Sequence, residues 1–420
     1  MGVRGSSKQS SSAAAAALAS PPHFSAIPRN ERLFICANFT SNLGNGIQII
    51  ASAYLVLIKT NSMLSTGILF VLAGLPQAIV ATASGALADK GHQKNLCILS
   101  DLVRALCVTA IPVSLIFNEF TVATLYAATF VVSLFDAIFT PVGSSWIQQL
   151  INREHYAQFS MFFEVSTQSA ALISSAVGGF CVQWFSVDYV FGFNALTFIV
   201  SAGLLYFMTS AQLTPGMASS GARTRLGARE WRADWRRLAP PVVLFAQNRI
   251  VSTVMNTLLV VLVIKTFQKG MGILGAVDAL AGLGFTAGAL TFGLLHRRFN
   301  AVSILFAGSI LSGAFIFAQP LLGVLGLAAA FLLSSIFYGV SRPAARLILM
   351  SSVENQYAGR VFGAANAIGF AGGAVGTVII SDVVNRYSIA AGYFAVAAYF
   401  LAVTITSALP LLRQGLSTQR

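Results

Sequence analysis

The sequence predicts an all-α membrane protein with 12 transmembrane helices in two pseudo-symmetric six-helix bundles. Three observations predict this fold: the composition, the number of long apolar segments, and a repeat between the two halves of the chain. Of the 420 residues, 56% are hydrophobic and 9% are charged, whereas a soluble globular domain carries roughly 25% charged residues. We therefore expect lipid to surround most of the chain.

The long apolar segments set the number of helices, because a helix needs about 20 mostly apolar residues to cross a bilayer. The first half contains six such segments, at 33–58, 64–88, 96–117, 122–147, 158–184 and 188–209. The second half contains six more, at 241–264, 270–295, 301–319, 321–347, 358–382 and 387–411. The expected domains are a disordered cytoplasmic tail over 1–32, a bundle over 33–209, a linker over 210–240, a bundle over 241–412 and a tail over 413–420.

The distribution of basic residues predicts the orientation in the membrane. Of the 26 Lys and Arg residues, twenty lie in the tails, in every second loop or at the segment ends that border those loops, four lie in the other loops, and Arg104 and Arg249 lie deeper within apolar segments. Cytoplasmic loops hold the excess of Lys and Arg. We therefore expect a multi-pass protein of the inner membrane with both termini in the cytoplasm. The net charge of +13 forms no clustered surface with interleaved aromatics, so we expect no nucleic-acid partner.

Two short matches indicate that the halves are duplicates. The sequence Val-Leu-Ile-Lys-Thr ends the first segment at 56–60, and Leu-Val-Ile-Lys-Thr ends the seventh at 262–266. In the same way, Phe135 and Pro141 match Phe337 and Pro343. Two similar bundles with a site at their interface near the bilayer midplane are typical of alternating-access carriers.

The loop after the second segment carries the most specific motif. Gly85 is followed four residues later by Asp89. The remaining members of the motif are Lys90, Lys94, Asp101 and Arg104. This pattern resembles the signature of the major facilitator superfamily between its second and third helices. The resemblance implies a cytoplasmic gate, in which Gly85 allows close helix packing and the charged residues bridge helix ends.

Two further segments resemble the branch of that superfamily that includes enterobactin and macrolide exporters. They are Phe139-Thr140-Pro141 through Gly178-Gly179, and Gly359-Arg360-Val361. The sequence departs from the family at His92, where the signature has Gly, and at Ser174-Ser175, where antiporters have a Gly-Pro pair. The second half also lacks the signature Asp after Gly293.

Ionisable side chains within apolar segments are costly and are candidates for functional sites. The candidates that we single out are Asp101, Arg104, Asp136, Glu164, Arg249 and Asp278. Asp101 and Arg104 lie three residues apart, so we expect them to neutralise each other in a structural role. Our hypothesis is that Asp136 or Glu164 carries the coupling proton, because burial of a carboxylate favours its protonated form. The alternative is that Asp136 pairs with Lys90 or Lys94 at the gate.

The resemblance implies that the first, fourth, seventh and tenth helices line a central cavity. The candidate cavity residues are Asn38, Asn42 and Asn45 in the first segment, Arg249 and Asn256 in the seventh, and Tyr338 in the tenth. Two roles are open for Arg249: it binds an anionic group of the substrate, or it neutralises Glu164.

The expected function is proton-coupled efflux of an amphipathic small molecule, a siderophore or a drug, by alternating access. We expect no enzyme activity, no metal and no cofactor, with the proton gradient as energy source, because the chain has no nucleotide-binding loop and its four His lie in the tail or the inner loops. The expected partners are the substrate and membrane lipids, and the protein is expected to be monomeric. Two alternatives remain: an uptake carrier or lysophospholipid-type flippase of the same fold, and a membrane receptor or scaffold that transports nothing.

Overall fold

The computed structural model describes residues 24–61, 65, 68–76, 80, 92–209, 228–268 and 271–413. Within these residues the chain forms helices and no strand. Ten of the helices in this part are long and apolar enough to cross a membrane. The prediction of an all-α membrane protein is therefore confirmed.

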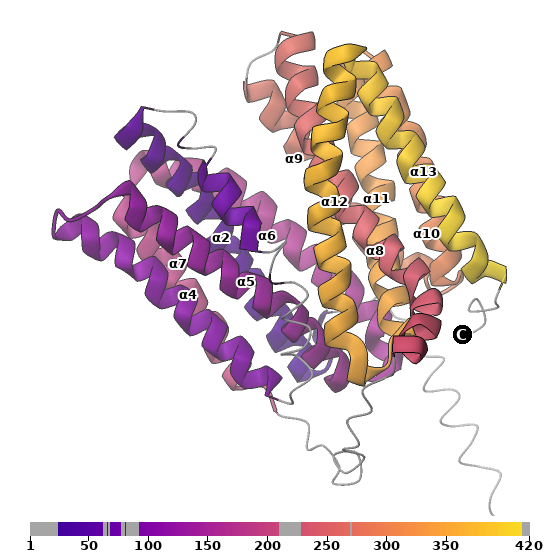
Figure 1. Ribbon diagram of the computed structural model, residues 1–420, viewed down its shortest axis with the longest axis horizontal. Coiled ribbons are helices and arrows are strands. Elements are labelled where there is room, and N and C mark those ends of the chain that lie inside the picture. Colours follow the sequence, from indigo (N-terminus) through magenta and orange to yellow (C-terminus); the bar gives the residue numbers. More distant parts are fainter. Residues whose placement is uncertain are drawn as a thin grey trace, which may run out of the picture.

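The helices form two groups (Figure 1). The first group, the N-bundle, contains α2 (Arg29–Thr60), the helical residues 68–76, α4 (Gln93–Ile116), α5 (Val122–Leu150), α6 (Tyr156–Trp184) and α7 (Val187–Tyr206). The second group, the C-bundle, contains α8 (Ala228–Val261), α9 (Met271–Leu295), α10 (Ala301–Ala318), α11 (Val324–Ser352), α12 (Ala358–Arg386) and α13 (Ile389–Arg413). The single-turn helices η2 (Arg153–His155) and η5 (Asn355–Tyr357) precede α6 and α12.

The two bundles repeat the same packing. In the N-bundle α2 packs against α6 and α7, and α4 packs against α5 and α7; in the C-bundle α8 packs against α12 and α13, and α10 packs against α11 and α13. The bounds of α11 lie 202 residues after those of α5, and the bounds of α12 lie 202 residues after those of α6. The predicted pseudo-symmetry is thus confirmed, and it relates each residue of α5 and α6 to one residue of α11 and α12.

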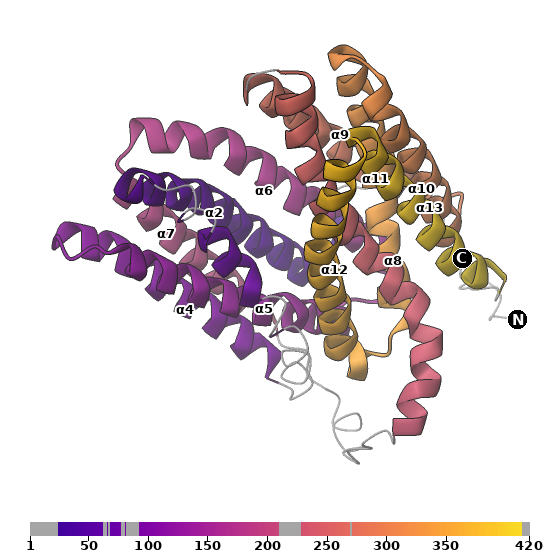
Figure 2. The same cartoon turned by 45° about the horizontal axis from the view of Figure 1, so that its top comes forward.

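The bundles share a core at one end only. We call this the basic end, where the even-numbered helices begin and where Arg29, Arg153 and Arg298 lie. One cluster of buried apolar residues extends across both bundles there and includes Trp146 and Leu347. Toward the opposite end the N-bundle and the C-bundle have separate clusters. Accordingly, the helices converge at the bottom of Figure 1 and diverge at its top, and the view in Figure 2 shows the same arrangement.

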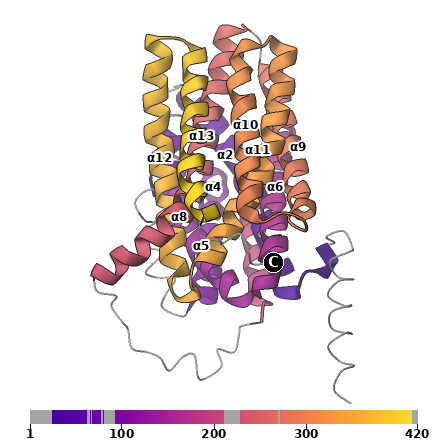
Figure 3. The same ribbon diagram turned by 90° about the vertical axis from the view of Figure 1, so that its right-hand side faces the viewer.

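Helix α8 begins inside the segment that the hydropathy pattern assigned to a linker. It starts at Ala228, and its first turns extend to the side of the C-bundle (Figure 3). The residues Ala228 to Leu238 include Ala, Arg, Glu and Leu, which favour helix irrespective of hydropathy. Pro240 and Pro241 follow within the helix. The predicted boundary at 241 therefore marks the entry into the bundle, and the remaining linker residues 210–227 lie outside the described residues.

Candidate substrate cavity and charge clusters

A cavity of about 160 Å³ lies between the two bundles. Its walls come from α6 of the N-bundle and from α8, α9, α10 and α11 of the C-bundle. Its polar lining consists of Gln168, Ser175, Ser252, Asn256, Asp278, Ser312, Ser334, Ser335, Tyr338 and Arg342, and its larger apolar residues are Leu172, Val251, Met255, Phe285, Ile316 and Phe331. A cavity that combines apolar side chains with convergent polar groups can bind a small molecule and fix its orientation.

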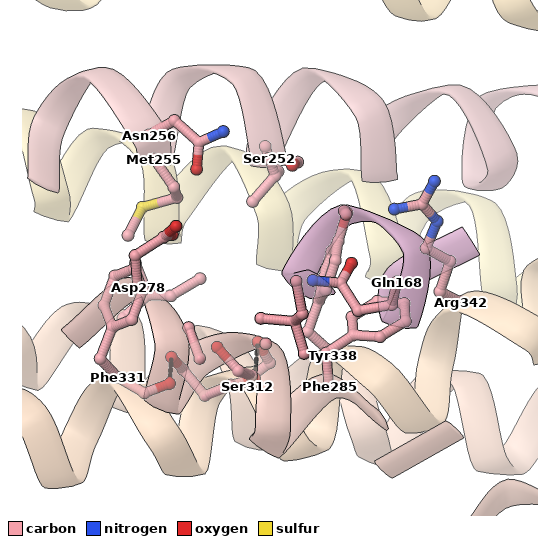
Figure 4. Close-up of a pocket in the computed structure, with 18 of the residues that line it drawn as sticks. Gln168, Ser252, Met255, Asn256, Asp278, Phe285, Ser312, Phe331, Tyr338 and Arg342 are labelled. Carbon is pink, nitrogen blue, oxygen red and sulfur yellow. Dashed lines mark hydrogen bonds between the residues drawn. The ribbon is translucent and has the colours of Figure 1, made fainter. Parts of the chain in front are cut away.

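The cavity has two chemically different ends (Figure 4). Asp278 lies at one end with Met255 and Asn256, and Arg342 lies at the other end with Tyr338. Asp278 follows the start of α9 at Met271 by about two turns, so it marks the end of the cavity that lies away from the basic end. Of the cavity residues expected from the sequence, Asn256 and Tyr338 line this cavity.

Beyond the Arg342 end of the cavity, a buried ionic cluster joins the bundles. The Glu164 carboxylate on α6 lies 2.8 Å from Nε of Arg346 and 3.0 Å from Nε of Arg342, both on α11. The Glu164 side chain is 1% exposed. The Arg346 guanidinium also lies over the rings of Phe163 and Phe245, 4.1 and 5.5 Å from their centroids. The cluster therefore connects α6 to α11 by charge and by cation–π contacts.

A second contact closes the basic end. The side-chain amide of Gln148 on α5 donates hydrogen bonds to the carbonyl oxygens of Met350 and Val353, both at 3.0 Å. These carbonyls end α11, and the last carbonyls of a helix have no partner within it. Gln148 is fully buried, so its amide caps α11 of the other bundle from within the closed interface.

A third cluster lies inside the N-bundle and holds Asp136. The Arg104 guanidinium bonds to the carboxylates of Asp101 and, at 3.1 Å, Asp136. It also lies between the rings of Phe139 and Phe198, at 4.7 and 4.6 Å from their centroids. Asp101 is completely buried, whereas the Asp136 side chain is 30% exposed. One guanidinium thus serves two carboxylates, and only Asp136 is accessible from outside the bundle.

Lys94 has a different partner from the one considered in the sequence. Its ammonium group donates to the carbonyl oxygens of Tyr206 and Met208 at 2.8 and 2.7 Å, which caps the end of α7. The pair of Lys94 with Asp136 is therefore absent, because the α7 carbonyls hold Lys94. Gly85, Asp89 and Lys90 lie outside the described residues, so their proposed part in the gate stays a prediction.

Arg249 does not neutralise Glu164, because Arg342 and Arg346 occupy that carboxylate. In the described part of the chain Arg249 forms no ion pair; its guanidinium lies 4.0 Å from the centroid of the Phe370 ring. Of the two roles considered for Arg249, the recognition of an anionic group therefore stays a prediction.

The asparagines of α2 contact the N-bundle and do not line the cavity. The Asn38 amide donates to the Thr167 hydroxyl of α6 at 3.0 Å, and the Asn42 amide donates to the Asn38 carbonyl at 2.7 Å. Asn45 lies one turn further along the same helix and is half-buried. Their role in substrate binding stays a prediction.

Sequence reasoning missed Gln148 and Arg346. Both lie near the ends of helices that hydropathy places in the membrane, and neither stands out in a stripe of polar residues. No local signal in the sequence could have found their contacts, because Gln148 and Arg346 bond to residues that lie 202 and 182 positions away on the other bundle.

Comparison with known proteins agrees with this architecture. The model of the Major Facilitator Superfamily matches residues 34–377. The uncharacterized MFS-type transporter YfiS of Bacillus subtilis is 26% identical, over 83% of this chain and 87% of that protein. The multidrug efflux pump Tap of Mycolicibacterium fortuitum is 24% identical, over 91% and 96% of the two chains.

Two solved structures show the same fold. A bacterial homologue of the iron transporter ferroportin in an outward-facing state has a TM-score of 0.71 at 12% identity and covers 92% of this chain and 99% of its own. The human organic anion transporter MFSD10 has a TM-score of 0.71 at 14% identity, with 90% and 99% covered. The fold, with a cavity between two repeated six-helix bundles, is that of a membrane carrier. The chain belongs to the major facilitator superfamily.

Proposed function

We propose that this protein exports an amphipathic small molecule, a drug or a siderophore, across the inner membrane in exchange for protons. The observation that carries the proposal is the position of the cavity, which lies where the bundles share a core on one side and have separate cores on the other. A site at such a boundary becomes accessible from either side when the bundles rock against each other. The similarity to a multidrug efflux pump over most of both chains supports the direction of transport.

The excess of Lys and Arg supports a cytoplasmic location for the basic end and for both termini. With this orientation, the closed side of the structure faces the cytoplasm and the cavity faces outward. An exporter in this form has released its substrate and is ready to take up a proton. The resemblance to enterobactin and macrolide exporters supports an amphipathic substrate, and we propose a monomer as the transporting unit.

Between the two candidate carboxylates, Asp136 is the better proton carrier. Glu164 is buried between two guanidinium groups, so its charge is compensated and no water reaches it. Asp136 shares Arg104 with Asp101 and is 30% exposed. When a proton binds Asp136, its carboxyl group loses the charge that pairs with Arg104, and Arg104 keeps its pair with Asp101. A group that changes the charge of its bundle in this way can bias the bundle toward one of two conformations.

Transport by the reconstituted chain tests the proposal. Proteoliposomes with an imposed proton gradient should accumulate a fluorescent amphipathic drug, and a protonophore should abolish the accumulation. Asp136→Asn should retain binding but lose accumulation against a gradient, whereas Asp382→Asn serves as the control, because Asp382 is 55% exposed and pairs with Arg386 on the same helix. Undiminished accumulation by Asp136→Asn would refute the coupling role, and an absence of any flux would favour a receptor or scaffold.

The direction and the substrate need a separate measurement. A strain that lacks the protein should retain more of an exported siderophore or antibiotic than its parent. Lower retention in the deletion strain would instead indicate uptake. A change confined to the distribution of lysophospholipid between the leaflets would indicate a flippase.

A further inference from the structure

The cavity contains one carboxylate without a counter-ion. Asp278 lines the cavity and is exposed. In the described part of the chain it makes no ion pair or hydrogen bond. The other carboxylates within the spans have basic partners: Asp101 and Asp136 contact Arg104, and Glu164 contacts two arginines. An uncompensated charge at membrane depth is costly, so it indicates a functional partner outside the chain.

The surroundings of Asp278 suit a positively charged group. Met255, Asn256 and Phe331 lie at the same end of the cavity (Figure 4). An aromatic face attracts a cation, the amide oxygen of Asn256 is a hydrogen-bond acceptor, and the Met255 sulfur is polarizable. Basic residues are absent from this end, because Arg342, the one Lys or Arg that lines the cavity among the described residues, lies at the other end.

The Arg342 end of the cavity favours a hydrogen-bond acceptor. The Arg342 guanidinium pairs with Glu164 at 3.0 Å and shares that carboxylate with Arg346, so this cluster keeps a net positive charge. Gln168 and Arg342 present N–H groups to the cavity. These groups can donate hydrogen bonds to a carbonyl or ether oxygen of a ligand. The two ends therefore differ in the ligand group that each one recognises.

We propose that Asp278 is the counter-ion of a cationic amphipathic substrate, whose ammonium group binds between Asp278 and Phe331 while its uncharged part, which can carry an acceptor oxygen, extends toward Arg342. This inference rests on the proposed export function, because the bound cation is a substrate only if the protein transports it. The volume of about 160 Å³ is similar to that of the roughly 150 Å³ cavity known to hold benzene. The part of a ligand that the cavity encloses is therefore about the size of one aromatic ring.

Binding of two small probes to the purified full-length chain in detergent tests the inference without any need for transport. Phenyltrimethylammonium is the cationic probe, and benzenesulfonate is an anionic probe of similar size. Wild type should bind phenyltrimethylammonium in equilibrium dialysis. Asp278→Asn should weaken that binding by about tenfold, since one close charge pair is lost, and Asp278→Glu should restore it to within about threefold.

Asp382→Asn is the matched control, because it removes an aspartate that pairs with Arg386 on the exposed side of α12, and its binding should equal that of wild type. Equal binding of the cation by wild type and Asp278→Asn overturns the inference. Failure of wild type to bind the cation, or tighter binding of benzenesulfonate, overturns it as well. Dialysis measures binding and not flux, so the two proposals can fail separately. If the chain binds the cation through Asp278 but transports nothing, the proposed export is wrong and the cation site is confirmed.

Discussion

Glu164 and Arg346 form an ion pair of 2.8 Å that crosses from the N-bundle to the C-bundle, and the repeat contains no second copy of it. The offset of 202 relates Glu164 to Asn366 and Arg346 to Ser144. The contact of α6 with α11 is therefore charged, whereas the pseudo-equivalent contact of α5 with α12 lacks this ion pair. The ionic contribution to closure of the basic end therefore comes from one side of the interface.

We expect Glu164→Gln to open the basic end. The change leaves Arg342 and Arg346 without their carboxylate, and removal of one partner of a buried ion pair costs about 3–5 kcal/mol. Even half of this free energy shifts an equilibrium between closed and open forms by more than about tenfold. Spin labels at the exposed positions 153 and 298, one in each bundle, should report a longer distance by pulsed electron paramagnetic resonance.

The control for this prediction is Asn366→Gln at the pseudo-equivalent position. The Asn366 amide donates to the Phe362 carbonyl within its own helix at 2.9 Å, so its replacement should leave the distance distribution between positions 153 and 298 unchanged. An unaltered distribution in Glu164→Gln would show that apolar packing alone keeps the basic end closed.

Gln148→Ala should weaken the same closure by a smaller amount. The substitution removes the two hydrogen bonds to the end of α11 and leaves buried carbonyls unsatisfied, at a cost of about 1–3 kcal/mol. The neighbouring Gln149→Ala is the control, since the Gln149 amide makes one longer bond, 3.4 Å, to the Asn355 carbonyl at an exposed site. Protection of a cysteine placed at position 160, which contacts Met350, should fall in Gln148→Ala and stay constant in Gln149→Ala.

The hydropathy and the repeat could predict the helices but not the contacts between bundles. Pro141 and Pro343 lie within α5 and α11, whose bounds follow the offset that these residues indicated. The partners of Glu164 could not be predicted, because they lie 178 and 182 residues away on the other bundle and no local pattern joins them. A single sequence shows which side chains are polar, but their partners depend on how the bundles dock.

The asparagines of α2 illustrate the same limit. A polar stripe on a membrane helix is equally compatible with a face toward a water-filled crevice and with a face that bonds to a neighbouring helix. Asn38 bonds to Thr167 of α6, and Gln48 bonds to Asn194 of α7. Both bonds lie within the N-bundle, where neighbouring helices satisfy polar groups that lipid would leave without partners.

Asp101→Asn should lower the stability of the N-bundle. Asp101 is completely buried and contacts Arg104 and the Ser201 hydroxyl, which donates to it at 2.7 Å. Loss of its charge leaves Arg104 with Asp136 as its one carboxylate partner among the described residues and weakens the buried hydrogen bonds of Asp101, at a cost of about 1–3 kcal/mol. The melting temperature in detergent should fall by several degrees. A variant that melts like wild type but loses proton coupling would assign Asp101 a functional role in place of the structural one.

Gly288→Ala should disrupt the packing of α9 against α11, whereas Gly275→Ala on the same helix should not. A Cβ atom at Gly288 would collide with the Ile336 carbonyl oxygen, which belongs to the backbone of α11 and cannot move alone, but a Cβ at Gly275 meets no atom within 4 Å. Alanine is favoured over glycine in a helix by about 1 kcal/mol. Gly275→Ala should therefore melt at or above the wild-type temperature. Gly288→Ala should melt several degrees below it, because the steric cost exceeds the gain in helix propensity. Equal melting temperatures for the two variants would mean that α9 and α11 are packed less closely than in this structure.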